Sequence, residues 1–215
     1  MPKDLFKLLR ASNELFNLNR KLKGMVIHPN KTIRATIVQA LSNMGMSANN
    51  ITLLSGNIEE IRNTMATIGP TVIVCNEFLD DTDFKEVLEL HEKLFPYRLE
   101  ASFIVLSEDG SISGATTQLE YFIDGYLSVP FTTQTLNNTL MEQFELKNKP
   151  AQGVVEFNRA REQFLLGKII AAEKLFSEIT YIESIAATCF AFLGLIEEMK
   201  GKKDKALEFF KKGVE

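Results

Sequence analysis

The sequence has 215 residues, of which 45% are hydrophobic and 24% charged, fractions typical of a globular protein with one large or two small domains. Its formal net charge of -4, without a dense Lys/Arg run away from the ends, argues against nucleic acid as a partner. It contains no stretch of about 18 apolar residues and no secretory leader pattern, so we expect neither a membrane span nor a signal peptide.

Cysteine and histidine are scarce. Cys75 and Cys189 lie far apart in apolar segments, which favours two reduced core thiols over a disulfide or a metal pair. His28 and His91 belong to no Cys/His cluster, so we expect no zinc site, and we place His91 half-exposed on a helix. These features predict a cytoplasmic protein without a bound cofactor or metal.

The N-terminal segment, residues 1–24, contains the pattern of an amphipathic helix over residues 4–22. Its apolar residues fall on one stripe and Gly24 ends it. The stripe comprises Leu5, Leu8, Leu9, Leu15, Phe16 and Leu22. Two interpretations stay open: the helix packs on the following domain, or it forms a dimer or partner contact.

Residues 25–146 alternate between short apolar runs and helical stretches. The runs are MVI at 25–27, ITLL at 51–54, TVIV at 71–74, SFIVL at 102–106 and GYLS at 125–128. The helical stretches are KTIRATIVQALSNM, IEEIRNTMATI, DFKEVLELHEKLF, GATTQLEYFI and TQTLNNTLMEQFEL. Apolar runs separated by helices predict an α/β domain with a doubly wound, five-stranded parallel sheet covered on both faces.

The third run continues as VIVCNEFLDDTD and brings Asn76 to the carboxyl end of a strand. Chemistry is usually placed there in parallel α/β domains, but an asparagine is uncharged and a poor nucleophile. The acidic loop behind it, with Glu77, Asp80, Asp81 and Asp83, leaves two alternatives. It holds a divalent ion, or it is a solvated loop in which Asp83 caps the next helix. The second alternative is favoured.

A polar stretch at 147–153, with Pro150 and Gly153, is typical of a linker, and a purely helical pattern follows it at 154–215. This part contains an internal repeat with an offset of 34 residues. The matching pairs are Gly167 and Gly201, Lys168 and Lys202, Ala172 and Ala206, and Phe176 and Phe210. A period of about 34 residues with small residues at fixed points resembles tetratricopeptide (TPR) helix pairs.

The TPR resemblance also includes Gly194, which with Leu193 matches a motif in the first helix of the second unit. The first unit departs there with Arg159 and Ala160, and neither unit has the usual final proline. In the family, the alanines permit close helix approach and the phenylalanines fill the groove between repeats.

A helical stack needs about three repeats or a cap to be stable alone. Either the α/β domain covers one end of the stack, or the sequence is a fragment of a longer protein, which we favour. We expect Leu207, Phe210 and Val214 to face a missing unit, so that this end dimerises or frays.

Residues 25–146 resemble the receiver domain of response regulators, beginning with MVIHPNKTIRATIVQAL and its Arg34. Ser107 matches the Ser or Thr at the end of the fourth strand, and Tyr126 matches the aromatic switch residue of the fifth. Pro130 matches a proline that the family holds in a cis bond. The resemblance implies a flavodoxin-like fold.

The acidic pocket of that family is missing from this sequence. His28 and Pro29 stand where two metal-binding acids are expected, Asn76 replaces the phospho-accepting aspartate, and Val129 replaces a lysine. Mg²⁺ needs hard oxygen ligands and phosphoryl transfer needs a carboxylate nucleophile. Three requirements for phosphorylation therefore fail together, which predicts a receiver-like domain that performs no chemistry.

The favoured function is a non-catalytic signalling adaptor, with protein partners bound through the TPR groove and the receiver-like surface. A homodimer is an open alternative. A regulator that is phosphorylated or binds metal in the acidic loop at 77–83, on Asp80 or Asp81, is the second hypothesis. A nucleotide-binding enzyme on a similar fold is the third, although the sequence has neither a phosphate loop nor a catalytic cluster.

Overall fold

A computed structural model describes residues 22–108, 117–118 and 120–214 of the chain. The chain divides into two compact units: one holds the residues up to Phe95 together with Glu100–Asn148, and the other holds Pro96–Leu99 together with the residues from Lys149 onward. The amphipathic helix expected over residues 4–22 lies outside the described residues, apart from Leu22. Gly24 opens the first strand, where it pairs with Ile51 and Val72, so the expected segment 1–24 is wrong at its last residue.

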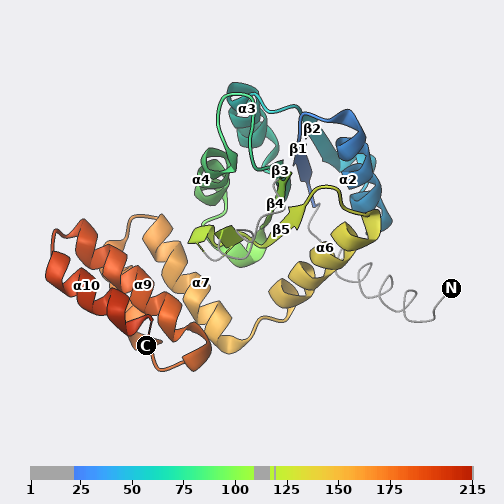
Figure 1. The fold of residues 1–215 in the computed structure, drawn as a ribbon. Coiled ribbons are helices and arrows are strands. Elements are labelled where there is room, and N and C mark those ends of the chain that lie inside the picture. Colours follow the sequence, from blue (N-terminus) through green and yellow to red (C-terminus); the bar gives the residue numbers. More distant parts are fainter. Residues whose placement is uncertain (1–21, 109–116, 119, 215) are drawn as a thin grey trace. The chain divides into compact units, whose positions relative to one another are not determined.

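The first unit is an α/β domain (Figure 1). Its elements are β1 (Gly24–Ile27), α2 (Lys31–Asn43), the 3-10 turn η1 (Ala48–Asn50), β2 (Ile51–Leu54), α3 (Ile58–Ile68), β3 (Val72–Asn76), α4 (Phe84–Leu94), β4 (Ser102–Ser107), β5 (Gly125–Ser128) and α6 (Thr133–Asn148). A second 3-10 turn, η2, covers Arg98–Glu100. The predicted doubly wound parallel sheet is confirmed, since all five strands pair in parallel in the order β2-β1-β3-β4-β5.

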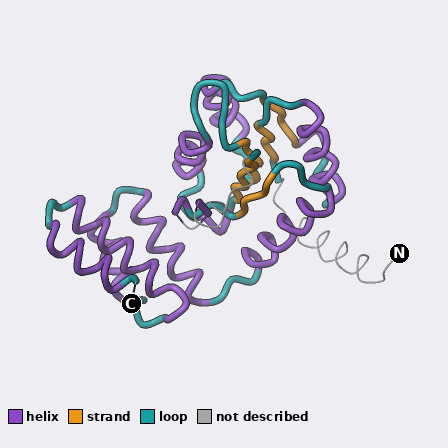
Figure 2. The backbone as a smooth tube through the Cα atoms, viewed as in Figure 1, coloured by secondary structure: helices purple, strands orange, loops and turns teal. Residues whose placement is uncertain are grey.

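Helices cover both faces of the sheet, with α2 and α6 on one side and α3 and α4 on the other (Figures 1 and 2). Alternation along the strands sends Ile73 and Cys75 into the cluster under α3 and α4, and Val72 and Val74 into the cluster under α2 and α6. The strands are continuously apolar because both faces are buried. The core therefore holds the carboxyl ends of β1, β3 and β4 at one fixed edge.

The helix ends follow from local side-chain chemistry. Asn30 caps α2 by accepting from Thr32 and Ile33, and Asn57 caps α3 by accepting from Glu60. Gly69 ends α3 in the left-handed conformation, with φ of 57°. The cis bond expected before Pro130 is present.

His91 is fully buried, so its expected half-exposed position is wrong. Its Nε2 lies 2.9 Å from the carbonyl oxygen of Pro70, and its ring lies 5.2 Å from that of Phe95. A polar partner in another part of the domain makes this burial tolerable.

The connection between the two units is shorter than the expected linker at 147–153. Lys147 and Asn148 continue α6, while Gln152 and Gly153 open α7, so residues 149–151 alone connect the helices. The Lys147 ammonium holds the end of α6 through an ion pair of 2.6 Å with Asp124. Pro150 lies in the connection because proline cannot continue a helix.

The second unit is built from α7 (Gln152–Leu165), α8 (Ile169–Glu178), α9 (Glu183–Met199) and α10 (Lys203–Lys212). These form two helical hairpins with the same turn, displaced by 34 residues. Gly167 and Gly201 both have a positive φ, of 70° and 74°. The amides of Lys168 and Lys202 bond to the carbonyls of Gln163 and Glu197, so the repeat in the sequence is also a repeat in hydrogen bonding.

The core of this unit is aromatic. Phe176 stacks on Phe192 with ring centroids 4.7 Å apart, and Phe157 and Phe164 contact the same Phe192 ring from α7. Ala172 and Ala206, displaced by one repeat, are both buried. No helix among the described residues is both long enough and apolar enough to cross a membrane.

Gly194 is fixed by a close helix crossing. A Cβ atom at this position would lie 2.5 Å from the Phe210 ring. We predict that Gly194→Leu lowers the free energy of unfolding by about 1–3 kcal/mol, because the ring cannot move away without losing its place between α9 and α10. Urea unfolding followed by circular dichroism measures the change.

The matched control is Ala187→Leu, which adds the same kind of side chain at an exposed position of the same helix. Its free energy of unfolding should stay within about 0.5 kcal/mol of the parent. Equal losses in the two variants would contradict a tight crossing at Gly194.

Candidate functional site

The candidate site is the edge of the sheet where β1, β3, β4 and β5 end. The register aligns Ile27 with Cys75 and Cys75 with Val105, so the residues that follow these strands are neighbours across the edge. His28, Asn76 and Ser107 are all buried there. The structure thus brings together three of the residues that the sequence placed in one pocket.

Asn76 does not offer its carbonyl-side neighbours to a cation. Its amide nitrogen donates to the carbonyl oxygen of Phe78 at 2.7 Å, which uses an oxygen of the kind that Mg²⁺ prefers. The side-chain oxygen of Asn76 is buried and has no hydrogen-bond partner among the described residues. The end of β3 is therefore a neutral amide closed onto its own loop.

Arg34 braces the loop between β1 and α2. Its guanidinium donates to the backbone carbonyl oxygens of His28 and Pro29, the latter at 3.1 Å. The His28 ring accepts the amide of Asn30 on Nδ1 at 3.0 Å, so a neutral ring carries its proton on Nε2. No carboxylate of this loop points at the edge, because neither His28 nor Pro29 has one.

Glu77 is the residue that sequence reasoning misassigned. We placed it among the candidate ion ligands of the acidic loop, whereas its carboxylate accepts hydrogen bonds from the hydroxyls of Ser107 and, at 3.2 Å, of Tyr126. These three residues come from β3, β4 and β5. The strand order 3-4-5 was the available signal, since it sets positions 77, 107 and 126 side by side.

The other acids of the loop support local structure. Asp83 accepts from the amide of Lys85 at 2.9 Å and is the N-cap of α4, as predicted. Asp81 accepts from the amide of Ile58 at 3.4 Å, at the start of α3. An antiparallel bridge between Phe78 and Asp83 closes the loop. Among the described residues, no group of three His, Cys, Asp or Glu side chains is placed to hold a metal ion.

Val129 lies on the other side of the edge. Its amide donates to the carbonyl oxygen of Ser107 at 2.7 Å, and its side chain packs against the apolar cluster under α2 and α6. This position therefore adds no positive charge to the edge. Tyr126, by contrast, packs its ring against the cluster under α3 and α4 and turns its hydroxyl to Glu77.

The TPR packing residues lie together in the second unit. Ala172, Phe176, Gly194 and Ala206 are buried between helices, and Phe210 is half-buried against Gly194. Gly167 and Gly201 form the two hairpin turns. A separate cavity of about 260 Å³ lies between α7 and α8, with Arg159, Glu156 and Tyr181 at its wall.

Comparisons with solved structures find receiver domains. A beryllofluoride-activated NtrC4 receiver domain dimer, solved in solution, is 18% identical over 60% of this chain and 99% of its own, with a TM-score of 0.50. A CheY-like receiver from Methanospirillum hungatei is 19% identical over 60% of this chain and 99% of its own (TM-score 0.47). A receiver from Clostridium thermocellum is 21% identical over 59% and 97% (TM-score 0.48).

These identities establish the fold of the first unit, which is the flavodoxin-like fold of receiver domains. No protein-family model and no curated protein matches the chain.

The buried His28 gives the site a pH dependence. Burial lowers the pKa of His28 below its ordinary value of 6.5; the Glu108 carboxylate opposes this shift and the Arg34 guanidinium adds to it. Below pH 6.5 the unfolded chain takes up a proton that the folded chain resists. The free energy of unfolding should therefore fall as the pH decreases from 7.5 to 5.5.

We predict that His28→Gln loses less stability than the parent over this pH range. Urea unfolding of both proteins at the two pH values measures the difference, and the titrating carboxylates are common to both. Parallel losses in the two proteins would mean that His28 is protonated as easily in the folded as in the unfolded chain.

Proposed function

We propose that the protein is a non-catalytic signalling adaptor, in which a receiver-like domain without phosphorylation chemistry is joined to TPR-like repeats that bind a protein partner. The observation that carries the first half is the carboxylate of Glu77, bound by the hydroxyls of Ser107 and Tyr126. A permanent carboxylate thus takes up the two hydroxyls of this edge from inside the chain.

The composition of the edge supports the same conclusion. A phospho-acceptor needs a carboxylate nucleophile and a bound Mg²⁺ with oxygen ligands. His28, Pro29 and Asn76 offer no charge, and the amide of Asn76 already binds the carbonyl of Phe78. Val129 packs into an apolar cluster and cannot compensate a phosphoryl group. Each requirement fails for a separate physical reason, and we therefore assign the domain no enzymatic activity.

The second half rests on the helical hairpins. A repeat of 34 residues with matched turns, buried alanines and interleaved phenylalanines resembles TPR units, whose surfaces bind peptides and helices. The two cysteines are free and buried, and burial raises the pKa of Cys189 to about 12, which keeps this thiol protonated and unreactive. Reduced thiols of this kind support a cytoplasmic location.

The test is chemical. We predict that the intact chain, incubated with Mg²⁺ and acetyl phosphate, gains no phosphoryl adduct by mass spectrometry. The Asn76→Asp variant should also gain none, because the carboxylates that would bind Mg²⁺ are still absent. An active receiver domain treated in parallel controls for the reagent.

An adduct on the parent chain would contradict the adaptor function. Its loss in Asp80→Asn or Asp81→Asn would then identify the acidic loop as the acceptor, and a regulator with a non-standard site would replace the adaptor.

A further inference from the structure

The outer face of α10 is apolar and open. Leu207 is 54% exposed and Val214 is 86% exposed. They share one side of the helix with Phe210, since residues at spacings of three, four and seven align on a helix. Phe210 turns one side of its ring to Gly194 and leaves the other half-exposed. We call the surface formed by Leu207, Phe210 and Val214 the α10 face.

The internal repeat indicates what such a face holds. One repeat earlier, the corresponding residues of α8 and its C-terminal turn are Glu173, Phe176 and Thr180. That face is covered by α9: Phe176 stacks on Phe192, and Glu173 forms an ion pair of 2.6 Å with Lys200 just beyond the end of α9. The α10 face is thus the repeated copy of a surface that a helix already covers within the same unit.

The substitutions between the two copies change the chemistry of the face. Leu207 replaces Glu173, so a lysine that corresponds to Lys200 would lose its partner. Lys203 replaces Ile169, and Lys211 lies one turn beyond Leu207 on the same side. Neither lysine forms an ion pair within the described part of the chain. The face is therefore an apolar centre between two cations.

Charge decides between a partner protein and a second copy. In α10, Lys203, Lys205, Lys211 and Lys212 outnumber Asp204 and Glu208. Two α10 faces brought together would oppose equal positive charges, whereas an acidic helix would neutralise them.

We propose that the α10 face binds an acidic amphipathic helix of a partner protein, with an aromatic residue against Phe210 and carboxylates beside Lys203 and Lys211. This proposal rests on the part of the proposed function that assigns partner binding to the repeats. It does not depend on whether the receiver-like domain is phosphorylated, so the two can fail separately.

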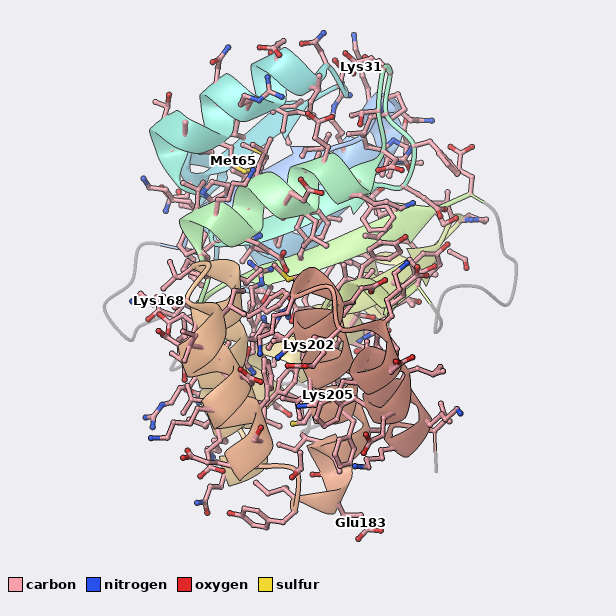
Figure 3. All side chains as sticks on the ribbon, turned by 90° about the vertical axis from the view of Figure 1, so that its left-hand side faces the viewer. Lys31, Met65, Lys168, Glu183, Lys202 and Lys205 are labelled. Atoms are coloured by element: carbon pink, nitrogen blue, oxygen red, sulfur yellow. The ribbon has the colours of Figure 1, made fainter. Side chains whose placement is uncertain are left out.

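The chain itself supplies the probe. The α9 sequence Glu183–Met199 covers the equivalent face of α8 and carries three acids, Glu183, Glu197 and Glu198, with no lysine or arginine. Figure 3 labels Glu183 at the start of α9 and Lys202 and Lys205 at the start of α10, at opposite ends of this hairpin. Because α9 runs antiparallel to its neighbours, its acidic C-terminal half would meet the end of α10 that carries Lys203.

The experiment titrates the full chain into a labelled synthetic peptide of Glu183–Met199, with Cys189→Ser to prevent oxidation, and follows fluorescence anisotropy. We expect saturable binding that weakens with added salt. Leu207→Glu should weaken it roughly tenfold or more, because it places a carboxylate in the apolar centre. The matched control is Ile170→Glu, an equally drastic change at a residue of α8 that is 83% exposed and lies outside the face. It should leave the affinity within about twofold.

A peptide with Glu197→Lys and Glu198→Lys should bind roughly tenfold more weakly than the acidic peptide. Absence of binding, or binding that Leu207→Glu leaves unchanged, would overturn the proposal. So would light scattering that shows a dimer of the parent chain but a monomer of Leu207→Glu, since the occupant of the face would then be a second copy.

Discussion

The carboxylate of Glu77 accepts hydrogen bonds from two hydroxyls that belong to two neighbouring strands, and the edge of the sheet is arranged around it. Hydrogen bonds to a charged acceptor are roughly twice as strong as neutral ones. They join the end of β3 to Ser107 on β4 and to Tyr126 on β5. The hydroxyls therefore have a permanent anionic partner inside the chain, and no phosphoryl group has to arrive to engage them. The neutral amide of Asn76 and the brace of Arg34 complete an edge that needs no metal to balance its charge.

The second unit depends on a different constraint, the absence of a side chain at Gly194. Because Phe210 occupies the space of a Cβ atom there, α9 and α10 approach closely and Phe210 reaches the surface on its other side. In the first hairpin the same position is Ala160, and its Phe176 is fully covered by Phe192. One repeat thus shows the completed packing and the other shows the same surface open. This internal comparison makes the chemistry of the α10 face readable without a bound partner.

Local chemistry predicts much of this fold. The bounds of β2 and β5 coincide with the expected apolar runs, because each run is bordered by turn-forming or polar residues. The Asp83 cap followed from a short acidic side chain before an apolar helical pattern. Likewise, the matched hairpin turns followed from the spacing of Gly167 and Gly201.

What the sequence did not predict depends on contacts between distant segments. The burial of His91 requires the carbonyl of Pro70, and the role of Glu77 requires the order of three strands. Neither contact leaves a local pattern, and the acids that follow Glu77 drew it into a charge cluster to which it does not belong. Asp81 was misjudged as a candidate acceptor for a similar reason, since it contacts the start of α3, which lies 23 residues earlier in the chain.

The most direct test of the closed edge uses amide spectra of the isotopically labelled chain, recorded with and without Mg²⁺ and beryllofluoride, a mimic of a phosphoryl group bound to a carboxylate. The account predicts that the amide signals of Asn76, Glu77 and Ser107 stay in place, because the edge has no acceptor carboxylate and Glu77 already engages the hydroxyls. Shifts that need both reagents and cluster on these three residues would contradict it.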